Sequence, residues 1–141
     1  MKKALATLVP ESRRLGFLPG LFGERRMIRG EALVYAWANR LSPDYTGGLW
    51  NFYKLSNGGA YLAPTRPERF NVAAIGSGYE GEMSADAFGV VVTLFALGQV
   101  AFEVAESARG ADSDKLVDSY HALRSFALDH AEAASILRAI D

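Results

Sequence analysis

Cysteine is absent from this 141-residue chain. Its absence excludes disulfides, thiolate metal sites and a cysteine nucleophile, and it fits a reducing cytosol. Histidine is scarce, because only His121 and His130 are present. Nucleophilic hydrolysis requires a serine or cysteine beside a histidine that a carboxylate orients. Few positions in this chain can therefore support that chemistry.

A long hydrophobic run is also missing. The longest apolar stretch, Ala87–Leu97, is far shorter than the roughly 20 residues that a membrane-spanning helix requires. Residues 1–10 carry two lysines and a short apolar run but no signal-peptide cleavage motif. We expect a soluble cytoplasmic protein with no membrane partner.

The composition is that of an ordinary globular domain, since 50% of the residues are hydrophobic and 22% are charged. No repeat, low-complexity tract or linker-like stretch interrupts the chain. We therefore expect one domain over residues 1–141, in which residues 1–12 are the least ordered part.

The net charge of −1 hides an uneven distribution. Residues 1–29 carry seven Lys/Arg and two acidic residues, whereas residues 76–141 carry four bases and eleven acids. The basic segment could bind nucleic acid, and the acidic segment could bind a basic protein groove. In the simpler interpretation, both sets of charges form the solvated surface of one compact domain.

Hydrophobic spacing predicts an α+β fold, in which a small three-stranded antiparallel sheet packs with about four helices. The predicted helices are Gly30–Leu41, Ala85–Ser107, a helix from Asp112 or Ser113 to Leu128, and Ala131–Ile140. The predicted strands are Leu49–Leu55, Ala60–Ala63 and Arg69–Ile75, which would form a meander.

The first two strands form a hairpin with Asn57-Gly58 or Gly58-Gly59 in its turn, because these residues tolerate positive φ. Trp50 and Tyr53 leave large apolar groups on both faces of the first strand. We expect them in the core between helices, and an exposed interaction patch is the alternative.

Local signals mark the helix boundaries. Ser84 is a good N-cap for the second helix, and it follows a glycine-rich loop at Gly76–Gly81. Arg109-Gly110-Ala111 breaks the chain before the third helix. Asp129 with Glu132 resembles a capping box for the last helix.

Neither histidine has neighbours that indicate catalysis. His121 shares a polar helical face with Asp118, and His130 follows Asp129, so we expect both on the surface. No Gly-x-Ser-x-Gly motif is present. The pattern favours a protein that is not an enzyme.

A metal site is an alternative at Glu80, Glu82 and Asp86, near the start of the second helix. Three carboxylates could hold Mg²⁺ or Ca²⁺. However, the spacing is not that of a calcium loop, and the helix dipole alone favours an acid in a first helical turn. We expect no metal and no cofactor.

Nucleic-acid binding is another alternative, because basic residues interleaved with aromatic ones can grip a backbone and stack on bases. The residues concerned are Arg13, Arg14, Arg25, Arg26 and Arg29, with Phe17 and Phe22 between them. The aromatic spacing is more typical of core anchoring, and no known nucleic-acid motif accompanies it.

Several uncommon strings occur in order along the chain. They are Arg29-Gly30-Glu31, Val34-Tyr35 with Trp37, the hairpin Gly47–Pro64, the segment Gly78–Ala87 and the ending Arg138-Ala139-Ile140-Asp141. On these motifs the chain, from about Phe17 onward, resembles the ArdB/KlcA family of antirestriction proteins of plasmids and other mobile elements. The family pattern Gly-Asn-Gly-Tyr is replaced here by Gly76-Ser77-Gly78-Tyr79.

The resemblance implies a compact α+β fold and relief of DNA restriction by type I restriction-modification enzymes, which protects incoming mobile DNA. It brings no catalytic residues, and the partner is the restriction enzyme, affected directly or indirectly. We expect the partner surface at Glu80, Glu82, Asp86 and Asp141, and a monomer, with a weak dimer as the alternative. A net charge of −1 argues against DNA mimicry, which needs about one charge per 1.7 Å of duplex axis.

Overall fold

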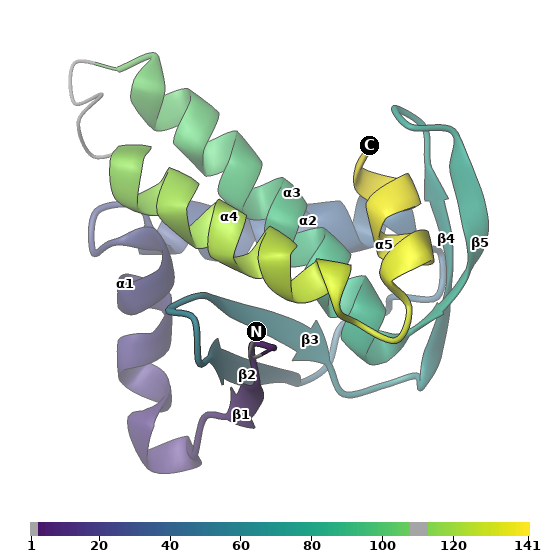
Figure 1. Ribbon diagram of the computed structural model, residues 1–141, viewed down its shortest axis with the longest axis horizontal. Coiled ribbons are helices and arrows are strands. Elements are labelled where there is room, and N and C mark those ends of the chain that lie inside the picture. The colour runs from purple at the N-terminus through teal and green to yellow at the C-terminus, as the bar shows by residue number, and fades with distance from the viewer. Residues whose placement is uncertain (1–2, 108–112) are drawn as a thin grey trace.

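The computed structural model describes residues 3–107 and 113–141 of the chain. Within them the elements are β1 (Ala6–Leu8), the 3₁₀ helix η1 (Glu11–Gly16), α1 (Phe17–Phe22), α2 (Met27–Leu41), β2 (Trp50–Leu55), β3 (Ala60–Pro64), β4 (Arg69–Ala74), β5 (Tyr79–Ser84), α3 (Ala85–Ala105), α4 (Ser113–Leu128) and α5 (Ala133–Ile140). The fold is α+β, as the sequence predicts (Figure 1).

The strands form two antiparallel sheets, β1-β2-β3 and β4-β5. The predicted meander is therefore wrong, because β4 pairs with β5 instead of β3. The outer edge of β3 is occupied by a helix side chain: the Thr93 hydroxyl accepts a hydrogen bond from Leu62 N–H and donates one to the Leu62 carbonyl, both at 3.3 Å. A strand that paired at this edge would have to displace Thr93.

The third strand of the first sheet is β1, which the sequence pattern did not predict. A strand of three residues is too short to show hydrophobic alternation. Its pairing extends on both sides, since Leu5 N–H donates to Ser56 Oγ (2.8 Å) and Val9 N–H donates to the Phe52 carbonyl (2.7 Å). Residues far apart in sequence thus complete this sheet.

The β2–β3 hairpin is confirmed, with Gly58 at φ +91° in its turn. Asn57 stabilises the turn and ties it to α4. Its Oδ1 accepts a hydrogen bond from Gly59 N–H (3.0 Å), and its Nδ2 donates to the Ala122 carbonyl (2.8 Å). Trp50 is 4% exposed, which confirms its place in the core.

The predicted loop Gly76–Gly81 is only partly a loop, because β5 begins at Tyr79. Glycine and glutamate disfavour strands, so the sequence pattern alone indicated irregular structure. Pairing of Val72 with Gly81 overrides that preference. Gly81 also makes room for the Tyr79 ring, since a Cβ at this position would lie 2.6 Å from Tyr79 Oη.

Helix α3 is the centre of the fold, and it packs against α2, α4, α5 and β3 (Figure 1). Its Phe88 is fully buried and stacks on Phe70 of β4, with ring centroids 4.4 Å apart. The predicted N-cap is confirmed, because Ser84 Oγ accepts a hydrogen bond from Ala87 N–H (3.1 Å). The helix is also long and apolar enough to cross a membrane, but 72% of its apolar 18-residue stretch is buried inside the protein.

The other helix boundaries follow the sequence in part. α2 begins at Met27 rather than Gly30, and α4 ends at Leu128 as predicted. The predicted break at Arg109-Gly110-Ala111 and the cap at Asp112 lie outside the described residues.

The last helix begins at Ala133, not at Ala131. The predicted capping box of Asp129 and Glu132 is wrong, because no side-chain hydrogen bond caps this helix. The Glu132 carboxylate is bonded to Ser84, at the start of α3. The Glu132 side chain therefore caps α3 through Ser84, which is distant in sequence, and does not cap its own helix.

Gly89 lets α3 lie directly against β3, because a Cβ there would lie 2.3 Å from Ala63 Cβ and 2.6 Å from the Leu62 carbonyl oxygen. Since the β3 backbone would have to move, we expect Gly89→Ala to lower the free energy of unfolding by about 2 kcal/mol or more. The control is Gly98→Ala in the same helix, where the nearest atom would lie 3.6 Å away. The control should be neutral or stabilising by up to about 1 kcal/mol. Urea denaturation measures both, and equal stabilities would contradict the prediction.

Candidate functional site

A hydrogen-bond network joins the first turn of α3 to β3 and to the connection between α4 and α5. Tyr61 Oη donates to Asp86 Oδ1, and His130 Nε2 lies against Asp86 Oδ2, each at 2.7 Å. The prediction of His130 as an ordinary surface residue is wrong, since its side chain is only 10% exposed. His121, by contrast, is exposed as predicted.

Both ring nitrogens of His130 are engaged. Glu132 N–H donates to His130 Nδ1 (2.9 Å), so this nitrogen carries a lone pair and the ring proton lies on Nε2. The Nε2 proton is in turn donated to Asp86. Neither nitrogen is free to accept a proton from a nucleophile, so the arrangement does not form a Ser-His-Asp triad.

The same contacts perturb two pKa values. Burial raises the pKa of the Asp86 carboxyl, but the hydrogen bonds from His130 and Tyr61 outweigh burial and leave it below its ordinary value of 3.8. Burial, together with the hydrogen bond to Asp86, raises the pKa of the Tyr61 hydroxyl far above its ordinary value. Tyr61 therefore stays protonated and Asp86 ionised at neutral pH.

A second carboxylate holds the start of α3 from the same connection. Glu132 Oε1 accepts a hydrogen bond from Ser84 N–H (2.9 Å), and Glu132 Oε2 accepts one from Ser84 Oγ. The junction between β5 and α3 is thus fixed at two adjacent points, by Glu132 and by His130. This geometry assigns the polar network a structural role.

The structure does not gather the predicted acidic residues into one site. Glu80 and Glu82 lie on the exposed face of the β4–β5 ribbon, and Glu82 forms an ion pair with Arg69. Asp86 belongs to the network described above. Within residues 3–107 and 113–141, no group of His, Asp and Glu side chains could hold a metal ion.

Asp141 follows α5 and forms an ion pair with Arg124 of α4 at 3.3 Å. It also borders a cavity that reaches Ala73 of β4. Ala73 lines the neighbouring shallow hollow that contains Glu80 and Glu82. Three of the four predicted partner-binding acids therefore lie near one another. Glu80 and Glu82 are on one face of the β4–β5 ribbon, and Asp141 is beside its tip.

The arginines of the alternative nucleic-acid surface are Arg13, Arg14, Arg25, Arg26 and Arg29. Two of them are engaged within the fold. Arg14 Nη2 donates to the Trp50 carbonyl (2.7 Å), and Arg29 forms an ion pair with Glu103 (2.7 Å). Only Arg13, Arg25 and Arg26 are free of such contacts within the described chain.

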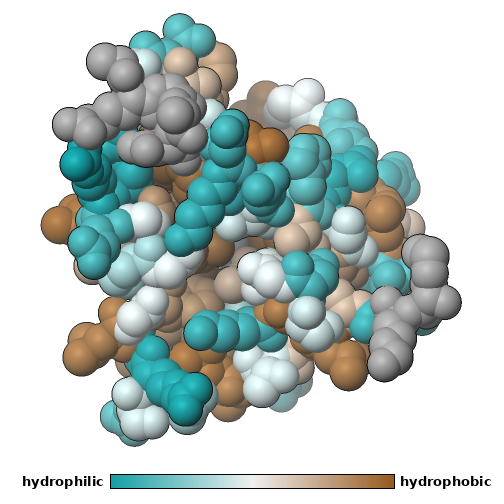
Figure 2. All heavy atoms as spheres, turned by 60° about the vertical axis from the view of Figure 1, so that its left-hand side comes forward, coloured by the Kyte–Doolittle hydropathy of each residue, from teal (hydrophilic) through white to brown (hydrophobic). Residues whose placement is uncertain are grey.

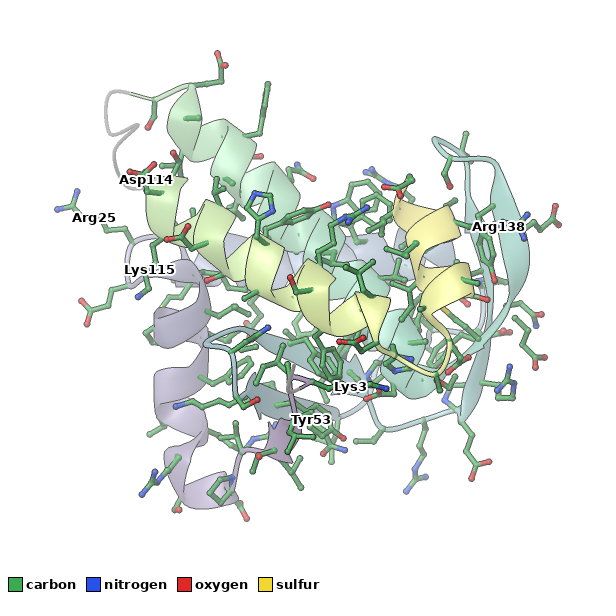
Figure 3. All side chains as sticks on the ribbon, in the orientation of Figure 1. Lys3, Arg25, Tyr53, Asp114, Lys115 and Arg138 are labelled. Atoms are coloured by element: carbon green, nitrogen blue, oxygen red, sulfur yellow. The ribbon has the colours of Figure 1, made fainter. Side chains whose placement is uncertain are left out.

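Arg25 and Arg26 border an open cavity of about 540 Å³ between the α1–α2 connection and the start of α4, with Lys115 opposite (Figure 3). Glu24 and Asp114 line the same cavity, so its charge is mixed. Figure 2 shows hydrophilic and hydrophobic residues intermixed on this side of the molecule. A continuous basic surface is not formed by the described residues there.

Within the described residues, these polar groups either support the fold or lie dispersed on its surface. A family model for antirestriction proteins matches residues 43–141. The chain belongs to the antirestriction protein family, which confirms the resemblance drawn from its sequence.

Known relatives match over nearly the whole chain. An antirestriction protein KlcA of Escherichia coli is 57% identical over 137 residues, which cover 96% of this chain and 94% of KlcA. A second KlcA of the same species is 54% identical over 97% of this chain and 93% of that protein. A solved structure of the KlcA and ArdB proteins superposes with a TM-score of 0.89 at 52% identity, over 100% of this chain and 99% of the other. Those proteins show a novel fold and antirestriction activity against type I DNA restriction systems in vivo but not in vitro.

The lowered pKa of Asp86 predicts a pH-dependent stability. The ionised carboxylate stabilises the fold above its ordinary pKa, and this contribution is lost as the pH falls through the lower pKa of the folded state. Because 42% of the Asp86 side chain is exposed and water screens its charge, we expect Asp86→Asn to lower the free energy of unfolding by only about 0.5–1.5 kcal/mol near neutral pH, and by much less near about pH 2. Urea denaturation across this range measures the effect, with Asp118→Asn at an exposed position of α4 as control. A loss of stability that does not change with pH would contradict the prediction.

Proposed function

We propose that this protein relieves DNA restriction by type I restriction-modification enzymes in the cytoplasm of its host, and so protects incoming mobile DNA. The observation that carries the proposal is the near-complete match to KlcA, at 57% identity over 96% of this chain. The matching KlcA and ArdB structure comes from proteins with this activity in vivo, which supports the same activity here.

The mechanism that we propose is not catalytic. His130 is the one histidine held against a carboxylate within the described chain, and its two nitrogens already bind Asp86 and Glu132 N–H. A general base needs a free nitrogen within reach of the proton that it removes. Binding to a partner therefore explains the activity better than hydrolysis does.

Mimicry of DNA is also disfavoured. The net charge is −1, and several acids of the acidic C-terminal half are bonded to groups of the protein itself. Glu103 pairs with Arg29, Glu82 with Arg69 and Asp141 with Arg124. A mimic of duplex DNA needs a long, uncompensated array of negative charge.

For the partner surface we propose the exposed face of the β4–β5 ribbon, with Glu80 and Glu82, together with Asp141 at the adjacent end of α5. Asp86 contributes by positioning the start of α3, because both of its oxygens accept hydrogen bonds inside the protein. The related proteins act in vivo but not in vitro. This difference favours a partner, present in cells, through which the restriction enzyme is affected indirectly. We propose that the protein acts as a monomer.

The direct test is the plating efficiency of unmodified phage on cells with a type I restriction system. We expect expression of the protein to raise plating by several orders of magnitude while DNA methylation stays intact. No rise with systems from more than one type I family would contradict the proposed function.

Charge reversal tests the partner surface in the same assay. We expect Glu80→Lys/Glu82→Lys to abolish relief of restriction without unfolding the protein, because both side chains are exposed and changes at such positions cost little stability. The matched control is the charge reversal Asp114→Lys/Asp118→Lys on α4, which should keep activity. Full relief by the ribbon variant would exclude this surface.

Nucleic-acid binding is a second candidate function, favoured by the grouping of Arg25, Arg26 and Lys115 around one cavity. A gel shift with duplex DNA at low salt tests it, since backbone contacts weaken steeply with added salt. Loss of the shift in Arg25→Glu/Arg26→Glu would support this function. No shift with the unaltered protein would exclude it.

A further inference from the structure

The tip of the β4–β5 ribbon, the end of α2 and the end of α5 enclose a cavity of about 320 Å³. Its walls are mostly apolar, with one basic and one acidic side chain. The lining residues that matter below are Trp37, Arg40, Ile75, Phe95, Ile140 and Asp141. Its volume is at the lower end of the range for small-ligand sites and is sufficient for one or two side chains of a bound peptide.

One wall is a rigid aromatic platform. Trp37 of α2 stacks on Phe95 of α3 with ring centroids 4.5 Å apart, and Trp37 Nε1 donates to Gln99 Oε1 at 2.9 Å. The Arg40 guanidinium lies over the Trp37 ring, 4.5 Å from its centre. A guanidinium that stacks on a ring through its face keeps the N–H groups on its edge available for hydrogen bonds.

Arg40 has no acceptor of its own. Within residues 3–107 and 113–141 its side chain makes neither a hydrogen bond nor an ion pair, unlike Arg29, Arg69 and Arg124. A guanidinium prefers to bind a carboxylate through two parallel hydrogen bonds. At the mouth of the cavity, the Arg40 guanidinium is therefore held in place by the Trp37 ring but is not paired with a carboxylate.

The opposite wall is a fixed hairpin turn with an apolar tip. Ser77 Oγ donates to the Ala139 carbonyl (2.8 Å) and so attaches the turn to α5. Ile75 in this turn is 95% exposed, although the adjacent Ala74 is buried. An exposed isoleucine on an attached turn beside an apolar cavity extends the apolar surface that a ligand can cover.

We propose that this cavity is a docking site for a short acidic, apolar peptide segment of a partner protein. An aliphatic side chain of the segment fills the space between Trp37 and Ile75, and a neighbouring carboxylate pairs with Arg40. The site takes a single carboxylate and not a polyanion such as nucleic acid, because Arg40 is the one basic side chain among the described residues that line it. This binding site goes beyond the proposed antirestriction activity, and its test does not involve restriction.

The test is a titration of the ¹⁵N-labelled full chain with the capped peptide Ser-Glu-Leu-Leu-Glu-Ser, followed by NMR. The chain has two tryptophans, and the buried Trp50 serves as an internal reference for Trp37. We expect a saturable shift of the Trp37 indole N–H signal and no shift for Trp50. Peptides with alanine for leucine should bind roughly tenfold more weakly, because the buried apolar area is lost.

Two variants of the protein complete the test. Arg40→Gln should weaken binding roughly threefold to fivefold, which is the scale of one exposed charge pair, and Ile75→Ser should weaken it as well. Arg13→Gln, which removes another exposed guanidinium from η1, should leave binding unchanged. Both positions under test are exposed, so both variants should stay folded, and loss of the Arg40 contact with the Trp37 ring should lower the melting temperature of Arg40→Gln by no more than a few degrees. Absence of a Trp37 shift, or equal binding by Arg40→Gln and the wild type, would overturn the proposal.

Discussion

The fold depends on the enclosure of α3. From Phe88 to Leu94 every residue of this helix is buried. Because its apolar residues lie on all sides, packing against a single neighbour could not bury them, and the helix must be surrounded. Burial of each such large side chain contributes about 1.5–3 kcal/mol, and α2, α4, α5 and both sheets pack on α3 to provide it. Gly89 sets how closely the first sheet approaches, and Thr93 closes the edge of that sheet. The separation into two sheets follows from this one helix.

The polar network at the start of α3 complements this apolar enclosure. Tyr61, His130 and Glu132 come from β3 and from the α4–α5 connection, and they meet the helix at Asp86 and Ser84. Apolar packing alone tolerates small rotations and shifts of a helix, whereas paired hydrogen bonds allow only one register. The network therefore fixes the position of α3. Because β5 leads directly into this helix, the network also fixes the position of the β4–β5 ribbon.

The arrangement of charge connects the fold to the function. The sequence shows an acidic C-terminal half, but the structure disperses those acids. Glu132 and Asp86 are bonded to groups within the protein, and Glu103 is paired with a basic side chain. Glu80 and Glu82 remain on an exposed ribbon, next to an apolar cavity with an unpaired arginine. The proposal that this surface recognises a protein, and does not imitate a nucleic acid, rests on this arrangement.

The sequence by itself determined the features whose signals are local: the start of α3 with its Ser84 cap, the glycine turn of the β2–β3 hairpin, and the motifs that identify the family. The helix predicted to run to Ser107 ends at Ala105. Only the tertiary structure decided which strands pair and which polar residues meet. β1 carries too few residues for a pattern, and β5 is rich in residues that disfavour strands, so pairing partners had to supply their stability. His130 and Asp86 are 44 positions apart. Their contact arises from the packing of α4 and α5 on α3, which no local pattern encodes.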